Sequence, residues 1–175
     1  MKRIFAIPAI ALLPLLGCQS ASSPENVVSL YLGGLQNQQP QQQKEAACFA
    51  SEGVKAKQPL LEIQKWEILD KEIKTESDDP DSKYSLVRAK IQEKSLGGMV
   101  VDRTWIFKVW NSTELFERNK RMFDKSNRDG QRVMQQANEV LKAAGKEPVE
   151  APKPIVPNRE QYSSRPYCIV AYEGQ

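Results

Sequence analysis

The sequence predicts an α+β domain in which N-terminal helices pack on an antiparallel sheet of about four strands, with a helical insertion before the last strand. Three observations support this prediction. Apolar residues recur at helical spacing after residue 23, segments rich in β-branched and aromatic residues follow between residues 66 and 110, and helical spacing returns over residues 111–145. A last apolar segment, residues 167–172, then predicts the closing strand.

The first helix is predicted to begin at Ser23-Pro24-Glu25. Serine is a favoured N-cap, proline fits the first helical position, and the acid faces the positive end of the helix dipole. The polar segment 36–43 is expected to form a loop, residues 44–49 a short helix, and residues 54–61 a further helical turn. The apolar residues of the first helix share one face: Val27, Val28, Tyr31 and Leu35.

The middle of the chain changes to a period of two residues, which is typical of strands. Turn-forming residues at 77–81 and the pair Gly97-Gly98 join successive strands, so an antiparallel meander is expected. The predicted strands are residues 66–73, 84–93, 99–110 and, at the end of the chain, 167–172.

Residues 111–145 are predicted to form the helical insertion, with a polar cap at Asn111 and a terminating Gly145. Asp129-Gly130 is expected to interrupt the helix between its two halves. Residues 146–158, called the strap below, hold four prolines and predict a semi-rigid extended connection.

The N-terminus has the layout of an export signal, with Lys2 and Arg3 followed by an apolar run over residues 4–16. Its end, Leu15-Leu16-Gly17-Cys18, resembles the lipobox of a bacterial lipoprotein precursor. The resemblance implies cleavage before Cys18, acylation of Cys18 with fatty acids such as palmitate, and anchoring in a membrane of the cell envelope. A spanning helix is excluded because the run falls short of the roughly 20 apolar residues needed. A plain secretory signal is the alternative.

The same resemblance implies a location and a domain layout. Gln19, rather than an aspartate, follows the cysteine, which implies the periplasmic face of the outer membrane if the host has two membranes. Residues 1–17 are then the signal peptide, residues 18–23 a tether, and residues 24–175 a single domain that includes the insertion and the strap.

Composition excludes several classes of function. The 175 residues carry a formal charge of +3, and cleavage of the signal peptide removes two of these charges, those of Lys2 and Arg3. A near-neutral mature chain lacks the clustered positive charge expected of a nucleic-acid-binding protein. The chain has no histidine, which excludes histidine-dependent nucleophiles and histidine metal sites. No cofactor or metal is predicted.

Two cysteines remain once Cys18 carries lipid. In an exported chain Cys48 and Cys168 are candidates for a disulfide. The alternative is a pair of buried thiols that act as small apolar residues.

The order of the elements carries a second resemblance. A lipobox followed by Ser23-Pro24-Glu25-Asn26-Val27-Val28 opening an amphipathic helix, and then by a sheet, resembles lipoproteins of the NTF2-like or cystatin-like superfamily. The resemblance covers residues 24–110 and 165–174, and it implies helices lying across a curved sheet to form a cone whose mouth can be a pocket. The superfamily includes enzymes, binding modules and assembly parts, so the fold does not choose among them.

Aromatic residues are the candidates for lining such a ligand pocket: Trp66, Tyr84, Trp105 and Trp110. The alternative is that they fill the core. An isomerase of the kind found in this superfamily would need a desolvated carboxylate beside a tyrosine hydroxyl, and the only strand residues to nominate are Asp102 and Tyr84.

Basic residues of the insertion are the candidates for contact with a partner: Arg118, Arg121, Lys125 and Arg128. The alternative is a solvated helix face, because an acid stands four residues before three of the cations. These pairs are Glu114–Arg118, Glu117–Arg121 and Asp124–Arg128.

Together the observations predict a non-catalytic envelope lipoprotein, anchored to a membrane through its N-terminal lipid, that acts as a protein-interaction or assembly module. The expected partner is another envelope protein, and the insertion is the expected contact. The alternative is a domain that binds a small ligand on the concave face of its sheet, and a further alternative is an NTF2-like isomerase or hydrolase.

Overall fold

The computed structural model describes residues 21–49, 51–56, 61–95 and 97–174. The lipobox and Cys18 lie outside these residues. In chain order the elements are α1 (Pro24–Gln36), α2 (Pro40–Ala46), β1 (Lys55–Ala56), β2 (Glu62–Thr75), β3 (Lys83–Lys94), β4 (Val100–Asn111), α3 (Ser112–Ala143), the 3-10 turn η1 (Arg159–Gln161) and β5 (Tyr167–Gly174).

The strands form one five-stranded sheet in the order β1-β5-β4-β3-β2. Neighbours from β2 to β5 are antiparallel, as predicted, whereas β1 runs parallel to β5 through the pairs Lys55–Ala171 and Ala56–Tyr172. The α+β class is therefore confirmed, and the expectation of an antiparallel sheet is corrected to a mixed sheet. β1 was not predicted for two reasons. Two residues are too few to show a strand pattern, and their pairing depends on a segment more than a hundred residues away.

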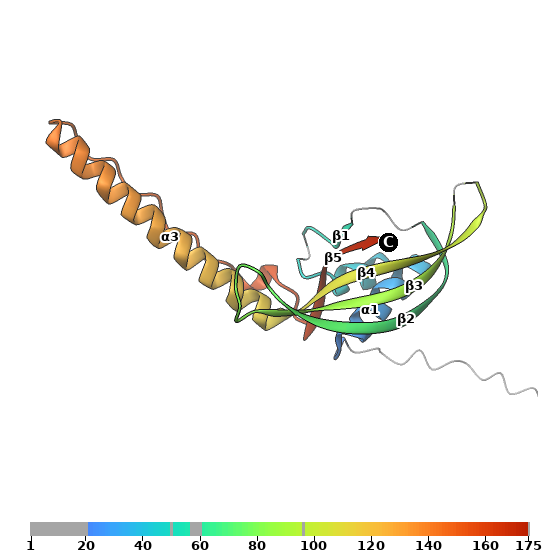
Figure 1. Ribbon diagram of the computed structural model, residues 1–175. Coiled ribbons are helices and arrows are strands. Elements are labelled where there is room, and N and C mark those ends of the chain that lie inside the picture. The colour runs from blue at the N-terminus through green and yellow to red at the C-terminus, as the bar shows by residue number, and fades with distance from the viewer. Residues whose placement is uncertain (1–20, 50, 57–60, 96, 175) are drawn as a thin grey trace, which may run out of the picture.

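One face of the sheet is covered by α1, around which the long strands curve (Figure 1). The N-cap of α1 is the predicted one, since the Ser23 hydroxyl accepts a hydrogen bond of 3.2 Å from the backbone N–H of Asn26. Alternation along β3 and β4 turns one row of apolar side chains toward the helix. The main core includes Val27, Val28, Tyr31 and Leu32 of α1 with Val87, Ala89, Ile91, Trp105, Phe107 and Val109 of the sheet.

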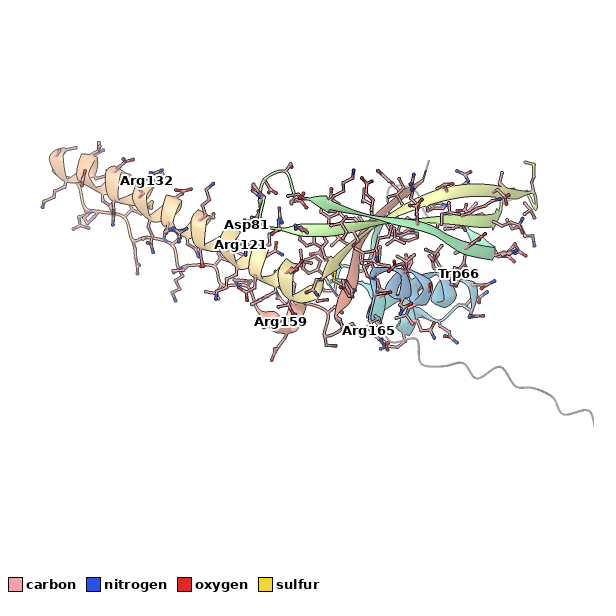
Figure 2. The ribbon with its side chains drawn as sticks, turned by 60° about the horizontal axis from the view of Figure 1, so that its bottom comes forward. Trp66, Asp81, Arg121, Arg132, Arg159 and Arg165 are labelled. Carbon is pink, nitrogen blue, oxygen red and sulfur yellow. A yellow bond between two sulfur atoms is a disulfide. The ribbon has the colours of Figure 1, made fainter. Side chains whose placement is uncertain are left out.

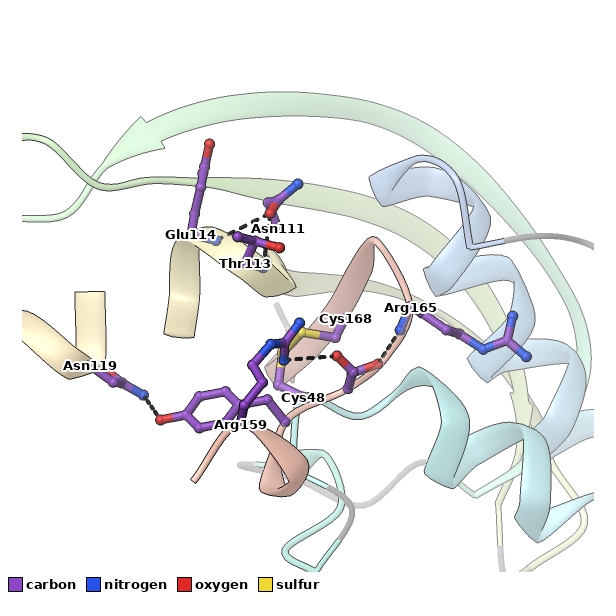
Figure 3. Close-up of a disulfide and its surroundings, with 10 residues drawn as sticks. Cys48, Asn111, Thr113, Glu114, Asn119, Arg159, Arg165 and Cys168 are labelled. Atoms are coloured by element: carbon purple, nitrogen blue, oxygen red, sulfur yellow. Dashed lines mark hydrogen bonds between the residues drawn. A yellow bond between two sulfur atoms is a disulfide. The ribbon is translucent and has the colours of Figure 1, made fainter. Parts of the chain in front are cut away.

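A second buried cluster lies where α3 leaves the sheet. Cys48 and Cys168 form a disulfide there, with their Cα atoms 4.7 Å apart, and they pack with Trp110 and Leu115. Cys48 lies just after the end of α2, and Cys168 lies at the start of β5 (Figure 3). The structure thus decides between the two alternatives for these cysteines in favour of the disulfide.

The helical insertion projects from the domain as one long helix (Figure 1). α3 has 32 residues, a length of about 48 Å at 1.5 Å per residue, and the strap returns along it toward η1. Asn111 caps its start, and Gly145 follows its end with a φ of 68°, which a glycine adopts without strain. α3 therefore lies within the residues predicted for the insertion, 111–145. We refer to α3 and the strap together as the arm.

Three local predictions were wrong. The expected loop at 36–43 contains the start of α2, because Pro40 suits the first turn of a helix. The helical turn expected at 54–61 is replaced by β1 where the chain is described, and residues 57–60 lie outside the described residues. α3 runs without interruption through Asp129-Gly130, since one glycine disfavours a helix by only about 1 kcal/mol relative to alanine.

Candidate interaction arm and the outer face of the sheet

The base of the arm is held by two arginines that reach the turn between β2 and β3. Arg118 donates from one nitrogen to both carboxylate oxygens of Asp78, at 2.8 Å each. Arg121 donates to Asp79 at 2.7 Å and to the Ser82 hydroxyl at 2.9 Å. Figure 2 shows Arg121 beside this turn. Two residues predicted as partner contacts therefore hold the arm to its own domain, through ion pairs with the turn.

These contacts change the acidity of the turn. The hydrogen bond from Arg118 lowers the pKa of the Asp78 carboxyl, and the hydrogen bonds from Arg121 and Ser82 lower the pKa of the Asp79 carboxyl. Both carboxylates therefore stay ionised, and keep their arginines, to a lower pH than ordinary aspartates would. Of the predicted contact residues, Lys125 and Arg128 lie further along the exposed side of α3.

Aromatic side chains complete the base. Trp110 stacks on Tyr84 with ring centroids 5.6 Å apart, and the ammonium of Lys108 lies 4.0 Å from the Tyr84 ring centroid. On the other side, Asn119 of α3 donates to the Tyr162 hydroxyl at 2.9 Å (Figure 3). The direction of the arm is thus set by ion pairs, ring contacts and the disulfide cluster together.

The strap is fastened to α3 by two asparagines that each bond both polar groups of one strap residue. Asn127 donates to the carbonyl of Ile155 at 2.8 Å and accepts from its N–H at 3.0 Å. Asn138 donates to the carbonyl of Val149 at 2.9 Å and accepts from its N–H at 2.7 Å. Eleven helical residues span about 17 Å and six residues of proline-rich extended chain about 19 Å, so the two spacings match.

The arm leaves apolar side chains in solvent along its length. Val133 and Val140 of α3 are 59% and 69% exposed, and Val156 of the strap is 76% exposed. Met122, Val149 and Ile155 are exposed as well. Val133 and Val140 stand seven residues apart and therefore share one side of α3. Several exposed apolar side chains on one projection are typical of a contact surface.

The aromatic residues predicted to line one pocket lie on two faces of the sheet. Trp105 is buried under α1, and Trp66 packs against the same core. Trp110 and Tyr84 belong to the cluster at the base of the arm, on the opposite face. The predicted pocket over the concave face is filled, because Trp105 and Phe107 occupy the space between sheet and helix.

A different cavity opens on the outer face, away from α1. It has a volume of about 510 Å³. Its floor is formed by Leu86 and Ile106 with Tyr84, and Lys55 and Lys108 are among its polar residues. Lys108 is paired with Glu76 at 2.7 Å. Of the predicted pocket residues, only Tyr84 lines this cavity. The alternation that placed Leu86 opposite Val87 could have indicated this face from the sequence.

The nominated catalytic pair is not brought together. Asp102 lies opposite Gln92 near one end of β3, while Tyr84 lies near the other end, and Asp102 is exposed and paired with Lys90 at 3.0 Å. The buried carboxylate is instead Glu93, which accepts a hydrogen bond of 2.6 Å from the Trp105 indole. Sequence reasoning did not identify Glu93, although Glu93 continues the inward row of β3 and the alternation could have indicated its burial.

The described part of the chain contains no cluster of His, Cys, Asp or Glu side chains able to hold a metal ion. Among its helices, none combines the length and the apolar composition needed to cross a membrane. Comparisons of the chain with protein-family models, with curated proteins and with solved structures find no match.

Proposed function

We propose that the protein is a non-catalytic envelope lipoprotein that is anchored through acylated Cys18 and acts as an assembly module, with the arm as its contact with another protein chain. The proposal combines the lipobox resemblance of Leu15-Leu16-Gly17-Cys18 with the shape of the domain.

The observation that carries the proposal is the arm itself. A helix of about 48 Å that contacts the rest of the domain mainly at its base buries little of its own surface, so most of its length adds little to the stability of the fold. The chain nevertheless braces it with Asn127, Asn138 and the two arginine–aspartate contacts. A stiff projection that presents exposed valines is suited to binding, because rigid apolar groups lose little entropy on association.

Photo-crosslinking in intact cells tests the arm. A benzoylphenylalanine in place of Val133 in the full chain should give a covalent adduct with a protein on illumination, because this side chain is exposed on the apolar side of α3. The same residue in place of Gln135, which is exposed on the opposite side of α3, is the matched control and should give less adduct. Absence of protein adducts at both positions would contradict the proposal.

A second experiment tests the anchor. Cys18→Ala should abolish labelling with fatty acid and release the protein from the membrane fraction or leave its precursor uncleaved. A correctly processed Cys18→Ala protein that still sediments with membranes would contradict the lipid anchor.

The cavity of about 510 Å³ on the outer face supports a second candidate function, the binding of a small molecule with an apolar part. The floor of Leu86 and Ile106 would hold that apolar part. Anilinonaphthalene sulfonate should bind the full chain and lose affinity after Ile106→Phe, which fills the floor. Thr104→Phe, on the same face but outside the cavity lining, is the control. Equal binding by the two variants would exclude this site.

A further inference from the structure

Five cations form one row along α3. They follow one another at alternating steps of three and four residues, so at 100° per residue they stay within an arc of about 80° around the helix. Neighbouring cations are about 4.5 to 6 Å apart along the axis, which is less than the screening length of about 8 Å at physiological salt. Their fields therefore add on one side of the arm. The members of this cationic row are Arg118, Arg121, Lys125, Arg128 and Arg132.

The acids of α3 do not pair with the row as the sequence suggests. An acid stands four residues before Arg118, Arg121 and Arg128, yet none of these three pairs closes as an ion pair among the residues that the structure describes. Arg118 and Arg121 bind the β2–β3 turn instead. Arg128 and its neighbour in the row, Lys125, are exposed and make no ion pair with any described residue.

The open part of the row is unfavourable for the chain by itself. Arg121 and Lys125 stand four residues apart, as do Arg128 and Arg132, and like charges at this spacing disfavour a helix. Arg132 pairs with Asp129 at 3.6 Å, but both side chains are more than half exposed, where an ion pair contributes little. Negative charge brought by another molecule would relieve this repulsion.

The β2–β3 turn shows what the row can bind. Arg118 donates to both carboxylate oxygens of Asp78, and Arg121 donates to Asp79. Consecutive carboxylates of one chain segment thus meet consecutive cations of the row. Figure 2 shows Arg121 beside this turn and Arg132 further along the arm. The turn occupies the first two positions of the row and leaves the next ones to solvent.

We propose that the rest of the row, from Lys125 to Arg132, binds an acidic segment of the partner protein, whose carboxylates continue the series that Asp78 and Asp79 begin. Charge complementarity of this kind gives specificity and speeds association. The inference rests on the proposed function, because it gives the chemistry of the partner that the arm contacts.

The same turn argues against a membrane as the occupant. Because Arg118 and Arg121 both bind it, the turn stands on the side of α3 that carries the row. A flat anionic surface laid along the row would meet the turn before it reached the cations near the base. A protein segment is narrow enough to lie along the row beyond the turn.

The strap leaves room for such a segment. At 100° per residue, Asn127 and Asn138, which bind the strap, point about 120° to 140° away from the centre of the row, and Val133 points about 100° away in the other direction. A segment that lies between the row and Val133 is therefore on the side of α3 opposite the strap. A photo-reactive group at Val133 should report on a partner held by the row.

Fluorescence anisotropy tests the row with a defined probe. The full chain in a neutral detergent should bind a fluorescein-labelled peptide of ten glutamates, with an affinity that falls as salt screens the charges. Lys125→Gln combined with Arg128→Gln should weaken this binding several-fold. Lys120→Gln combined with Lys142→Gln is the matched control. It also removes two exposed cations of α3, at positions about 80° to 120° away from the centre of the row, and should leave the affinity nearly unchanged.

Equal loss of affinity in the two double variants would mean that binding follows net charge, and would overturn the inference. Absence of peptide binding would overturn it as well. Row-dependent binding to vesicles of phosphatidylcholine with one third phosphatidylglycerol, without binding to the peptide, would make an anionic membrane the occupant in place of a protein segment.

Photo-crosslinking in intact cells separates this inference from the proposed function. The chain with benzoylphenylalanine at Val133 should lose most of its protein adduct when Lys125→Gln and Arg128→Gln are added, and should keep it with the control pair. An adduct that the row variant leaves unchanged would overturn the inference and leave the proposed function standing. Absence of adducts from positions 133 and 135 in the chain with its native charges would overturn both.

Discussion

Glu93 is a charged residue inside the main core, with 1% of its surface exposed. Its carboxylate accepts from the Trp105 indole at 2.6 Å, and Arg103 lies 3.6 Å away at the edge. A buried carboxylate persists only where donors replace water. Glu93 therefore acts as the acceptor that lets a tryptophan N–H lie in the core.

Replacement of Glu93 by leucine should destabilise the protein by about 1 to 3 kcal/mol, because the Trp105 N–H is left without an acceptor. Glu93→Gln keeps an acceptor oxygen of similar reach and should retain more of the stability. Urea unfolding followed by tryptophan fluorescence measures both. A leucine variant as stable as the glutamine variant would show that the hydrogen bond contributes nothing.

The arm pairs two elements that differ in rise per residue, the α-helix α3 and the extended strap. The helix and the strap make contact at Asn127 and again at Asn138, and each asparagine supplies both a donor and an acceptor to one strap residue. A side-chain amide is the group that can do this, since its oxygen accepts while its nitrogen donates. The strap thereby satisfies backbone groups without forming a strand.

Asn138→Ala should loosen the strap locally and leave the domain intact. The two bonds to Val149 contribute about 0.5 to 1.5 kcal/mol each, so the Val149 amide should exchange its hydrogen several-fold faster or more. Gln135→Ala, on the exposed side of the same helix, is the control and should leave that rate unchanged. Unaltered exchange at Val149 in the Asn138 variant would contradict the contact.

The contact between α3 and the β2–β3 turn predicts a dependence on pH. Arg118 and Arg121 lower the pKa of Asp78 and of Asp79 in the folded state. Their contribution is then fully present above the ordinary aspartate pKa of about 3.9 and is lost as the pH falls through the lower, folded values. The base of the arm should be insensitive to pH between neutrality and mild acid.

Tryptophan fluorescence, to which Trp110 next to Arg118 contributes, should therefore stay constant to about pH 4 and change below it. Asp78→Asn combined with Asp79→Asn should show the changed signal already at neutral pH, because an amide cannot pair with a guanidinium as a charge does. Asp124→Asn, which removes an exposed acid of α3, is the control and should show the same pH profile of fluorescence as the unmodified chain. A double variant with the unmodified pH profile would assign the signal to other groups.

At the scale of the molecule, the disulfide joins residues separated by 120 positions and closes most of the domain into one loop. In the chain-entropy model a loop of this length contributes about 4 to 5 kcal/mol by restricting the unfolded chain. It also holds the segment after α2 against the strand that ends the chain.

Cys48→Ala with Cys168→Ala should lower the free energy of unfolding by up to about 5 kcal/mol. Reductant should destabilise the unmodified chain by a similar amount and leave the double variant unchanged. Chemical denaturation with and without reductant measures both. An undiminished free energy of unfolding in the double variant would contradict the expected contribution of the disulfide to stability.

Local elements could be predicted from the sequence because their causes are local. Ser23 and Pro24 begin α1, Asn111 and Gly145 bound the insertion, and alternation places the inward residues of β3. The site could be predicted only in outline. The insertion was identified as the candidate contact, but the expected role of Arg118 was changed by a turn forty residues away.

By itself the sequence determined the α+β class and the presence of a long helix before the last strand, since these depend on periods of two or about four residues. Only the tertiary structure decided which cysteines bond, that β1 joins the sheet in parallel, that the predicted pocket is filled while another opens on the far face, and that α3 stands away from the domain. The reason is physical: each of these features depends on contacts between residues far apart in the chain, and a local pattern carries no information about which distant surface will be its neighbour.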